Sequence, residues 1–311
     1  LGVLMGNSYQ KSKGRSFFLR NKSMKLWKEW VKELNYLDGK LKFEKPLIKL
    51  ATSKKEYQSM INVIKNKKLY TITPLDKNSI EKWSILFEKK LIGGLISYED
   101  GRLNPIKLMK AFMQKINSMK VNKINDSVNN IQRNSNLLNK KWTLSFNENN
   151  EIHQDFIIIC SSLNSQKLLK LVGHEIFLEP ILGQAVELEL TNKNKEWDKW
   201  PAVVNYQSIN FIHPTPSKIL IGATLEPGSK PNALARKQML TINDTAPAWI
   251  KEAKIIHQWN GLRARPLNEP APILKELEPG LLINTGHYRN GILLAPACAE
   301  WIGDKIDNYI F

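Results

Sequence analysis

The chain has 311 residues, of which 42% are hydrophobic and 24% charged, and a formal net charge of +17. This composition is typical of a globular protein with a core, and the absence of any run of 18 apolar residues excludes a membrane-spanning helix. The positive charge comes from lysines spread along the chain, without an arginine-rich stripe that contains aromatic residues, so it does not by itself predict nucleic-acid binding.

Amphipathic patterns predict helices in the first 120 residues. We expect them over 23–34, over 52–65, in a short stretch after Asn78, and over 105–118. Ser53 and Glu56 have the spacing of a capping box, and Pro105 suits a first helical turn. A strand bounded by turn residues is expected over 93–101.

After Lys120 the pattern becomes that of short strands. The strands are expected over 128–133, 141–147, 155–160, 184–190, 202–205, 209–213, 219–224, 253–265 and 281–285. Helices are expected over 232–240, around 246–250 and over 290–309. The run 156–160 is apolar on both faces, as in a buried strand of a parallel sheet. The α/β texture at both ends and the strand-rich middle predict two interleaved domains.

Two residue types that often form cross-links or metal sites give no such signal here. Cys160 and Cys298 each lie in an apolar stretch, which indicates small core residues in a reducing, cytoplasmic compartment and no disulfide. The histidines outside the carboxy-terminal motif lack ligand-like spacing, so no metal site is expected.

The most informative segment is Gly286-His-Tyr-Arg-Asn-Gly-Ile-Leu-Leu-Ala-Pro296. It reads as a strand end, a glycine-rich turn and a helix start, where free N–H groups and the helix dipole favour negative charge. Glycines also let the backbone approach a flat ligand closely. Such a loop taken alone is more simply explained as a helix cap.

A second segment, Trp259-Asn-Gly-Leu-Arg-Ala-Arg-Pro266, precedes it. An arginine on a strand between apolar neighbours needs an anionic partner, and a guanidinium can hold a carboxylate with two parallel hydrogen bonds. Arg263 is therefore a candidate anchor for an acidic substrate. An internal ion pair with an Asp or Glu is the alternative.

Together these segments resemble the carboxy-terminal signature of the D-amino-acid oxidase superfamily, and within it the glycine oxidases of thiamine biosynthesis. Weaker matches occur in the same order at 100–105, 180–185 and 221–228, so the resemblance covers nearly the whole chain. It implies an α/β (α+β) fold: an FAD-binding Rossmann-like domain interleaved with a substrate domain built on a mostly antiparallel sheet. The remainder of the FAD-binding domain is expected in 1–40, 95–175 and 255–311, and the substrate domain in 41–94 and 176–254.

The resemblance also implies residue roles. It places Arg263 and Arg289 near the substrate carboxylate and Phe211 on the substrate side. The positions that it places at FAD are Val128, Ser162, Gly261, Leu262, Gly286, His287, Arg289, Asn290, Gly291, Ile292 and Leu293. His287 and Tyr288 are expected to pack beside the flavin and not to act as acid and base.

Three departures from the family pattern stand out. Ser161-Ser162 replaces the usual Ala-Gly beside the dinucleotide, and Phe211 replaces a substrate-side tyrosine. The family's opening βαβ unit with Gly-x-Gly-x-x-Gly is missing, and the chain begins with Leu1. We read this as a fragment or a mis-started chain, with a natural truncation as the alternative.

The resemblance implies oxidation of the C–N bond of a small amino acid or amine, such as glycine, sarcosine or a D-amino acid, with electrons passing to O2 to give H2O2. Alternatives are a quinone-linked amino-acid dehydrogenase and a flavin-less remnant with a binding role. We expect no nucleic-acid partner, no membrane span and no metal. The sequence leaves the oligomeric state open, a homo-oligomer included.

Overall fold

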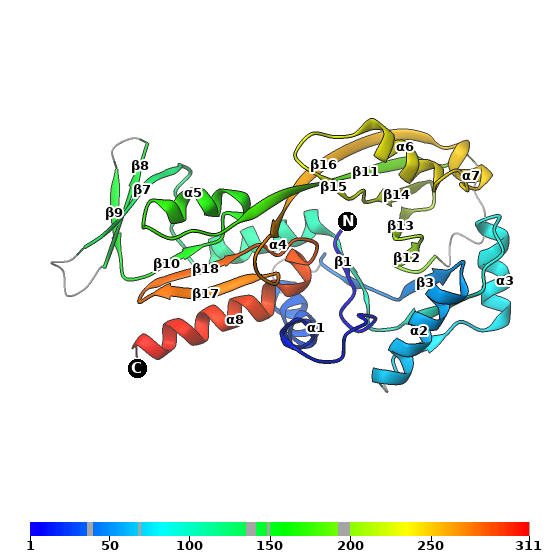
Figure 1. The fold of residues 1–311 in the computed structure, drawn as a ribbon, viewed down its shortest axis with the longest axis horizontal. Helices are drawn as coiled ribbons and strands as arrows, with labels where there is room; N and C mark the ends of the chain where they lie inside the picture. Colours follow the sequence, from blue (N-terminus) through cyan, green and yellow to red (C-terminus); the bar gives the residue numbers. More distant parts are fainter. Residues whose placement is uncertain (36–39, 68–69, 135–140, 148–149, 192–199, 311) are drawn as a thin grey trace. The chain divides into compact units, whose positions relative to one another are not determined.

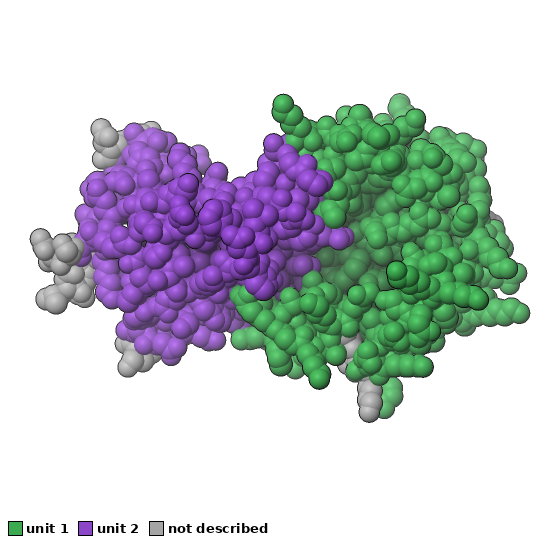
Figure 2. Space-filling model, viewed as in Figure 1, with its two compact units in different colours: residues 1–116, 182–226, 230–261 green, residues 117–181, 227–229, 262–311 purple. Residues whose placement is uncertain are grey.

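The computed structural model describes the chain except for residues 36–39, 68–69, 135–140, 148–149, 192–199 and 311 (Figure 1). It divides into two compact units, each assembled from separate stretches of the chain (Figure 2). Unit 1 comprises Leu1–Ile116, Leu182–Glu226 and Lys230–Gly261, and unit 2 comprises Asn117–Ile181, Pro227–Ser229 and Leu262–Phe311.

The helices of the described residues are α1 (Arg15–Leu34), α2 (Lys54–Lys67), α3 (Lys77–Leu86), α4 (Pro105–Ser118), α5 (Ser165–Lys170), α6 (Ala233–Thr241), α7 (Ala248–Lys251) and α8 (Gly291–Ile310), with a short 3-10 helix, η1 (Ser162–Asn164). The strands are β1 (Val3–Leu4), β2 (Phe43–Glu44), β3 (Leu47–Ala51), β4 (Ile72–Pro74), β5 (Gly93–Ser97), β6 (Gly101–Leu103), β7 (Val128–Arg133), β8 (Trp142–Phe146), β9 (Glu151–Gln154), β10 (Ile157–Ile159), β11 (Leu178–Glu189), β12 (Val203–Tyr206), β13 (Ile209–Thr215), β14 (Lys218–Gly222), β15 (Glu226–Pro227), β16 (Lys254–Pro266), β17 (Ile273–Glu278) and β18 (Leu281–Thr285).

A large mixed sheet dominates unit 1. Its strands follow the order β15-β11-β14-β13-β12-β3-β5-β4, and β16 pairs with β11. The pairing of β12 with β3 is parallel, whereas β13 with β14 and β3 with β5 are antiparallel. One face of this sheet buries the largest apolar cluster of the unit, in which Phe87, Tyr206 and Phe211 are fully buried. The predicted mostly antiparallel sheet is thus confirmed.

Helix α1 begins earlier than its apolar pattern predicts. The pattern starts at Ser23, but the helix begins at Arg15, after Gly14 with φ of 83°. Arg20 is buried on this first part, where its guanidinium donates to the Met5 carbonyl at 3.1 Å and lies over the Tyr9 ring. These tertiary contacts stabilise a helical turn that has no apolar periodicity of its own.

Side-chain caps define the start of two other helices. At the start of α2, the Glu56 carboxylate accepts from the Ser53 backbone N–H, and the Ser53 hydroxyl accepts from the Glu56 backbone N–H. This is the predicted capping box. Asn232 caps α6, where its side chain accepts from the N–H groups of Leu234 and Ala235. Both helices therefore begin near the predicted residues because local hydrogen bonds specify the start.

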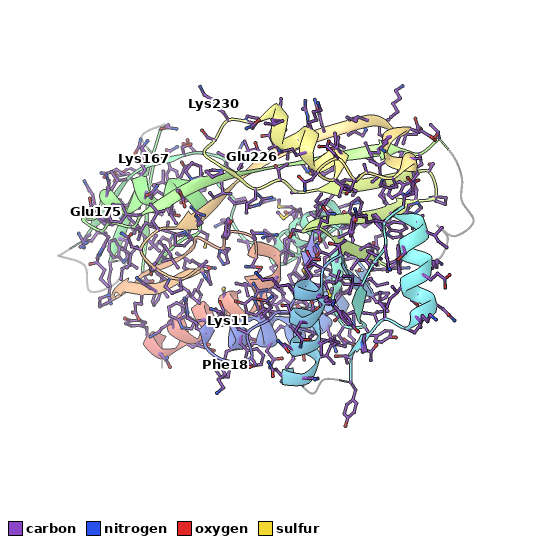
Figure 3. All side chains as sticks on the ribbon, turned by 45° about the vertical axis from the view of Figure 1, so that its right-hand side comes forward. Lys11, Phe18, Lys167, Glu175, Glu226 and Lys230 are labelled. Carbon is purple, nitrogen blue, oxygen red and sulfur yellow. The ribbon has the colours of Figure 1, made fainter. Side chains whose placement is uncertain are left out.

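Unit 1 also contains a buried carboxylate, Glu226, labelled in Figure 3. Its oxygens accept from the Gln184 side-chain amide at 3.0 Å, the Asn232 backbone N–H at 2.7 Å and the Thr224 hydroxyl. A buried charge is tolerated when several donors surround it. The network joins β11, the chain after β14 and the start of α6.

Unit 2 contains two sheets of three strands, β10-β18-β17 and β7-β8-β9. Strand β10 pairs with β18 in parallel, which confirms the prediction that residues 156–160 form a strand of a parallel sheet. The α5 side of the sheet buries Leu169 against Ile159 and Ile283, and α8 lies on its other side (Figure 1). One face of β10 is less covered than predicted, since Ile158 remains 39% exposed.

Two sequence interpretations need correction. The single strand expected over 93–101 is two strands, β5 and β6, because the chain bends at Tyr98 and Glu99. The Asp100 side chain then accepts from the N–H groups of Asn7 and Ser8. Cys298 is buried as predicted, but Cys160 is exposed, because it follows the end of β10 and belongs to a loop. Both cysteines are free thiols.

Candidate active site

The candidate site of unit 2 lies where two parallel strands end. Ile157 and Ile159 of β10 pair with Leu281 and Ile283 of β18, so both carboxyl ends reach the same edge of the sheet. The loop after β10 contains Ser162, and the turn after β18 begins at Gly286. Ligands of α/β proteins bind outside the carboxyl ends of such strands. The fold therefore brings together two segments that the sequence separates by more than a hundred residues.

A hydrogen-bonded pair of side chains links the two strand ends. The hydroxyl of Thr285, the last residue of β18, donates to the Ser162 carbonyl at 3.1 Å and accepts from the Ser165 hydroxyl at 3.1 Å. Sequence reasoning missed Thr285 and Ser165. The available signal was weak, because single hydroxyl residues are common in any loop.

Ser162 itself has a backbone conformation that favours glycine. Its φ is 55°, in the left-handed region that side chains with a Cβ rarely adopt. The resemblance expects glycine here, and the observed φ gives a physical reason for that preference. The Thr285 hydroxyl bond helps to hold this strained residue in place.

The turn after β18 contacts β16 directly. The Tyr288 backbone N–H donates to the Ala264 carbonyl at 3.1 Å. Gly286 has φ of 64°, and a Cβ built on it would lie 2.7 Å from Pro266 Cγ, so a larger residue does not fit. Within unit 2, the part of the first segment from Leu262 to Pro266 is thus adjacent to the turn that begins at Gly286.

Strand alternation sets the direction of the arginines on β16. Ala264 is buried in the core of unit 2, and its neighbours Arg263 and Arg265 are half-buried and point to the other face. Arg265 forms an ion pair with Glu179. An internal ion pair thus occurs on this strand at Arg265, and Arg263 also has an interaction with the rest of the chain.

Helix α8, 20 residues long, begins directly after the turn. The Asn290 N–H donates to the His287 carbonyl at 3.0 Å and the Leu294 N–H to the Asn290 carbonyl at 2.9 Å, which closes the turn and starts the helix. Arg289 is exposed at this start, and among the described residues it has no hydrogen bond or ion pair. A free cation and the positive end of a helix dipole together favour an anion.

Gly291 gives the start of α8 an open side. A Cβ built on Gly291 would have only the Cβ of His287 within 4 Å, at 3.9 Å. On β16, Gly261 has nothing within that distance. In unit 2, Gly291 thus leaves backbone accessible to a flat ligand, whereas Gly286 is buried. Gly261 is open too, but it belongs to unit 1.

His287 is a neutral side chain at ordinary pH. Burial lowers its pKa from 6.5 to about 4, because the charged imidazolium would lose its hydration. The side chain is partly buried, and Tyr288 beside it has φ of 54°. A neutral imidazole suits the packing role predicted for His287.

The remaining predicted residues lie in different surroundings. Val128 begins β7 and pairs with Phe146, and it is half-buried. Leu262 is exposed on β16, Ile292 is half-buried and Leu293 is buried. Phe211 lies in unit 1, fully buried, with its ring 5.3 Å from that of Phe87. This burial does not support a contact between the Phe211 ring and a substrate.

Neither a metal cluster nor a membrane helix is found in the part of the chain that the structure describes. No group of three or more His, Cys, Asp or Glu residues there could hold a metal ion. None of the described helices is both long enough and apolar enough to cross a membrane.

Comparison with known proteins identifies the family. The family model described as FAD dependent oxidoreductase, named DAO, matches residues 1–305. The chain belongs to the DAO family of FAD-dependent oxidoreductases. The resemblance seen in the sequence is therefore confirmed.

The curated relatives are glycine oxidases. That of Pseudomonas putida is 28% identical over 160 residues, which cover 49% of this chain and 41% of the relative. That of Bacillus subtilis is 27% identical over 165 residues, 51% of this chain and 42% of the relative. The matched stretches thus span less than half the length of these relatives.

Solved structures share the fold over almost the whole chain. Glycine oxidase from Geobacillus kaustophilus has a TM-score of 0.84 at 22% identity and covers 99% of this chain and 83% of its own. Iminodiacetate oxidase from Chelativorans sp. BNC1 has a TM-score of 0.84 at 18% identity, and the match covers 99% of this chain and 84% of that protein. The predicted mixed α/β fold is confirmed.

Proposed function

We propose that this protein is an FAD-dependent oxidase that acts on the C–N bond of a small amino acid or amine and transfers electrons to O2. The observation that carries the proposal is the hydrogen bond from the Tyr288 N–H to the Ala264 carbonyl. It joins the turn proposed for the flavin ring to the strand that carries the proposed carboxylate anchor, Arg263. The curated glycine oxidases support this substrate class.

The residues of unit 2 fit an FAD group on its ring side. Gly291 leaves the start of α8 open, and the helix dipole and Arg289 favour negative charge there. The proposed ring-side contacts in unit 2 run from Gly286 to Leu293, with Leu262 on β16. Gly261, which the resemblance also places at FAD, is the last residue of unit 1 on that strand. On the nucleotide side we propose Val128 and Ser162. Bound FAD supplies an acceptor for a hydride from the carbon next to the substrate nitrogen.

The proposed task of the two arginines is orientation. Arg263 would hold the substrate carboxylate, with Arg289 as a second cation, so that the α-carbon faces the flavin ring. His287 adds no charge beside them, because it is neutral above a pH of about 4. A substrate amine that is already deprotonated requires no protein base, so these residues suffice for the proposed step.

Finer parts of the proposal follow from the likeness to glycine oxidases alone. They are the choice of glycine, sarcosine or a D-amino acid as substrate, O2 as acceptor with H2O2 as product, and a role in thiamine biosynthesis.

An alanine at Gly291 tests the proposed flavin position. A Cβ at Gly291 has space around it, and Gly291 is the first residue of α8. We therefore expect Gly291→Ala to leave the free energy of unfolding unchanged or to raise it by up to about 1 kcal/mol. The same methyl group would occupy the space proposed for the ring, and FAD affinity should fall at least about tenfold. Equal FAD affinity in the variant and the wild type would show that no flavin approaches Gly291.

A further inference from the structure

A chain of hydroxyl groups crosses the two strand ends of unit 2. Ser161 Oγ lies 3.2 Å from Ser165 Oγ, Ser165 donates to Thr285 Oγ1 at 3.1 Å, and Thr285 donates to the Ser162 carbonyl at 3.1 Å. Ser165 is fully buried and Thr285 is 2% exposed. Buried hydroxyls need partners, and these satisfy one another.

The direction of every bond in the chain is determined. The Ser162 carbonyl can only accept a hydrogen bond, so the Thr285 hydroxyl donates its one proton to it. The Thr285 oxygen must therefore accept the bond from the Ser165 hydroxyl. Ser165 therefore has no proton left for Ser161, and Ser161 donates to it. Because each hydroxyl proton has one assigned acceptor, removal of any member leaves a buried neighbour without its bond.

The chain ends at the residues where the backbone leaves the parallel strands. Ser162 has φ of 55°, and Thr285 is followed at once by Gly286 with φ of 64°. An apolar residue such as valine would serve the strand equally well at position 285, since Thr285 pairs with Ile273 through the backbone. The hydroxyl is thus not needed to form β18, and its effect is on the loops.

We propose that Thr285 and Ser165 are positioning residues that hold the Ser161–Ser162 loop and the Gly286–Asn290 turn in a fixed relation for FAD. The inference rests on the proposed function, in which the first segment lies at the nucleotide side and the second at the ring side. Neither residue is assigned a contact with the cofactor. They act through the backbone that they hold.

The first test needs no cofactor. Hydrogen exchange is followed by mass spectrometry on peptides that contain 160–163 and 286–291 in the wild type, Thr285→Val and Thr285→Ser. Loss of the hydroxyl is expected to speed exchange in both segments about tenfold, and serine is expected to restore it. Unchanged exchange in Thr285→Val would overturn the inference.

Thr143→Val is the matched control. Thr143 is also a buried threonine on a strand of unit 2, and its hydroxyl bonds to Asn134 at 2.9 Å and to His153 at 2.8 Å. It lies in β8, in the other sheet of the unit. Its loss should leave exchange at 160–163 and 286–291 unchanged. Equal acceleration by both variants would mean a general loss of stability and would also overturn the inference.

The second test measures FAD affinity by fluorescence titration. Thr285→Val and Ser165→Ala are each expected to weaken FAD binding about tenfold, and the double variant by little more than either, because both break one chain. Wild-type affinity in Thr285→Val would overturn the proposed effect on FAD. A wild-type chain that binds no FAD would instead refute the proposed function, and the exchange result would still decide whether the hydroxyls position the loops.

Discussion

The backbone N–H of Tyr288 donates a 3.1 Å hydrogen bond to the carbonyl of Ala264. Tyr288 lies in the turn before α8, and Ala264 lies on β16 between Arg263 and Arg265. This bond fixes the turn against the strand, and the close approach of Gly286 to Pro266 supports it. Backbone contacts within unit 2 thus hold the proposed ring-side and carboxylate-side segments together.

We expect Ser162→Gly to stabilise the chain. Ser162 has φ of 55°, and the removal of its Cβ relieves left-handed strain that exceeds the added entropy of a glycine in the unfolded state. The expected gain is about 0.5–1 kcal/mol in the free energy of unfolding, measured by denaturant titration.

Ser161→Gly is the control for that substitution. Ser161 has φ of −89°, where glycine relieves no strain, and its hydroxyl is lost as well. This variant should be less stable than the wild type by about 1 kcal/mol. A gain in stability from Ser161→Gly, or a loss from Ser162→Gly, would contradict the role assigned to backbone strain.

His287 should make stability depend on pH in the acid range. Its pKa in the folded chain is about 4, below the 6.5 of an exposed histidine. As the pH falls from 6.5 to 4, His287 binds a proton in the unfolded chain but not in the folded chain. The free energy of unfolding therefore falls, by at most on the order of 3 kcal/mol. Above pH 6.5, His287 does not make the free energy of unfolding depend on pH.

The measurement is the free energy of unfolding at a series of pH values for the wild type and His287→Gln. In the variant, the free energy of unfolding should fall less steeply between pH 6.5 and 4 than in the wild type. Parallel curves for the two proteins would show that His287 titrates normally.

Phe211→Tyr distinguishes a core position from a substrate-side position. The Phe211 ring is fully buried among aromatic rings, including that of Trp249, so a new hydroxyl would lose its hydration without a partner. We expect a loss of about 1–3 kcal/mol in the free energy of unfolding. Unchanged stability with a gain in activity would instead favour the substrate-side role that the sequence resemblance implied.

Arg263→Ala is expected to weaken substrate binding without loss of FAD. Removal of a guanidinium that holds a carboxylate costs about 2–5 kcal/mol, which would appear in KM more than in kcat. Arg236→Ala is the control, because Arg236 is a helix-surface arginine that donates to Gln258. An unchanged KM in Arg263→Ala would exclude it as the carboxylate anchor.

The sequence predicted elements best where local signals fix both ends. The bounds of α4, β7 and β18 match the expected 105–118, 128–133 and 281–285, since caps, alternation and turn residues mark them. The start of α1 was missed because contacts of Arg20 with Met5 and Tyr9 stabilise it from outside the helix.

Residues of the candidate site can likewise be proposed from the sequence only where a local motif marks them. Gly286 and Gly291 belong to a motif that can be recognised in the sequence, and the structure gives each a distinct backbone role. Thr285 and Ser165 could not be found in that way, because their significance depends on a parallel pairing between β10 and β18. Long-range pairing of this kind is not encoded in any local pattern.

The most direct test of the proposed function is to add FAD to the purified chain and then a small amino acid in the absence of oxygen, following the yellow absorbance of oxidised flavin. We expect FAD to stay with the protein through gel filtration and glycine, sarcosine or a D-amino acid to bleach it, with Arg263→Ala requiring a higher concentration. A chain that retains no FAD, or a bound flavin that none of these amines reduces, would contradict the proposed function.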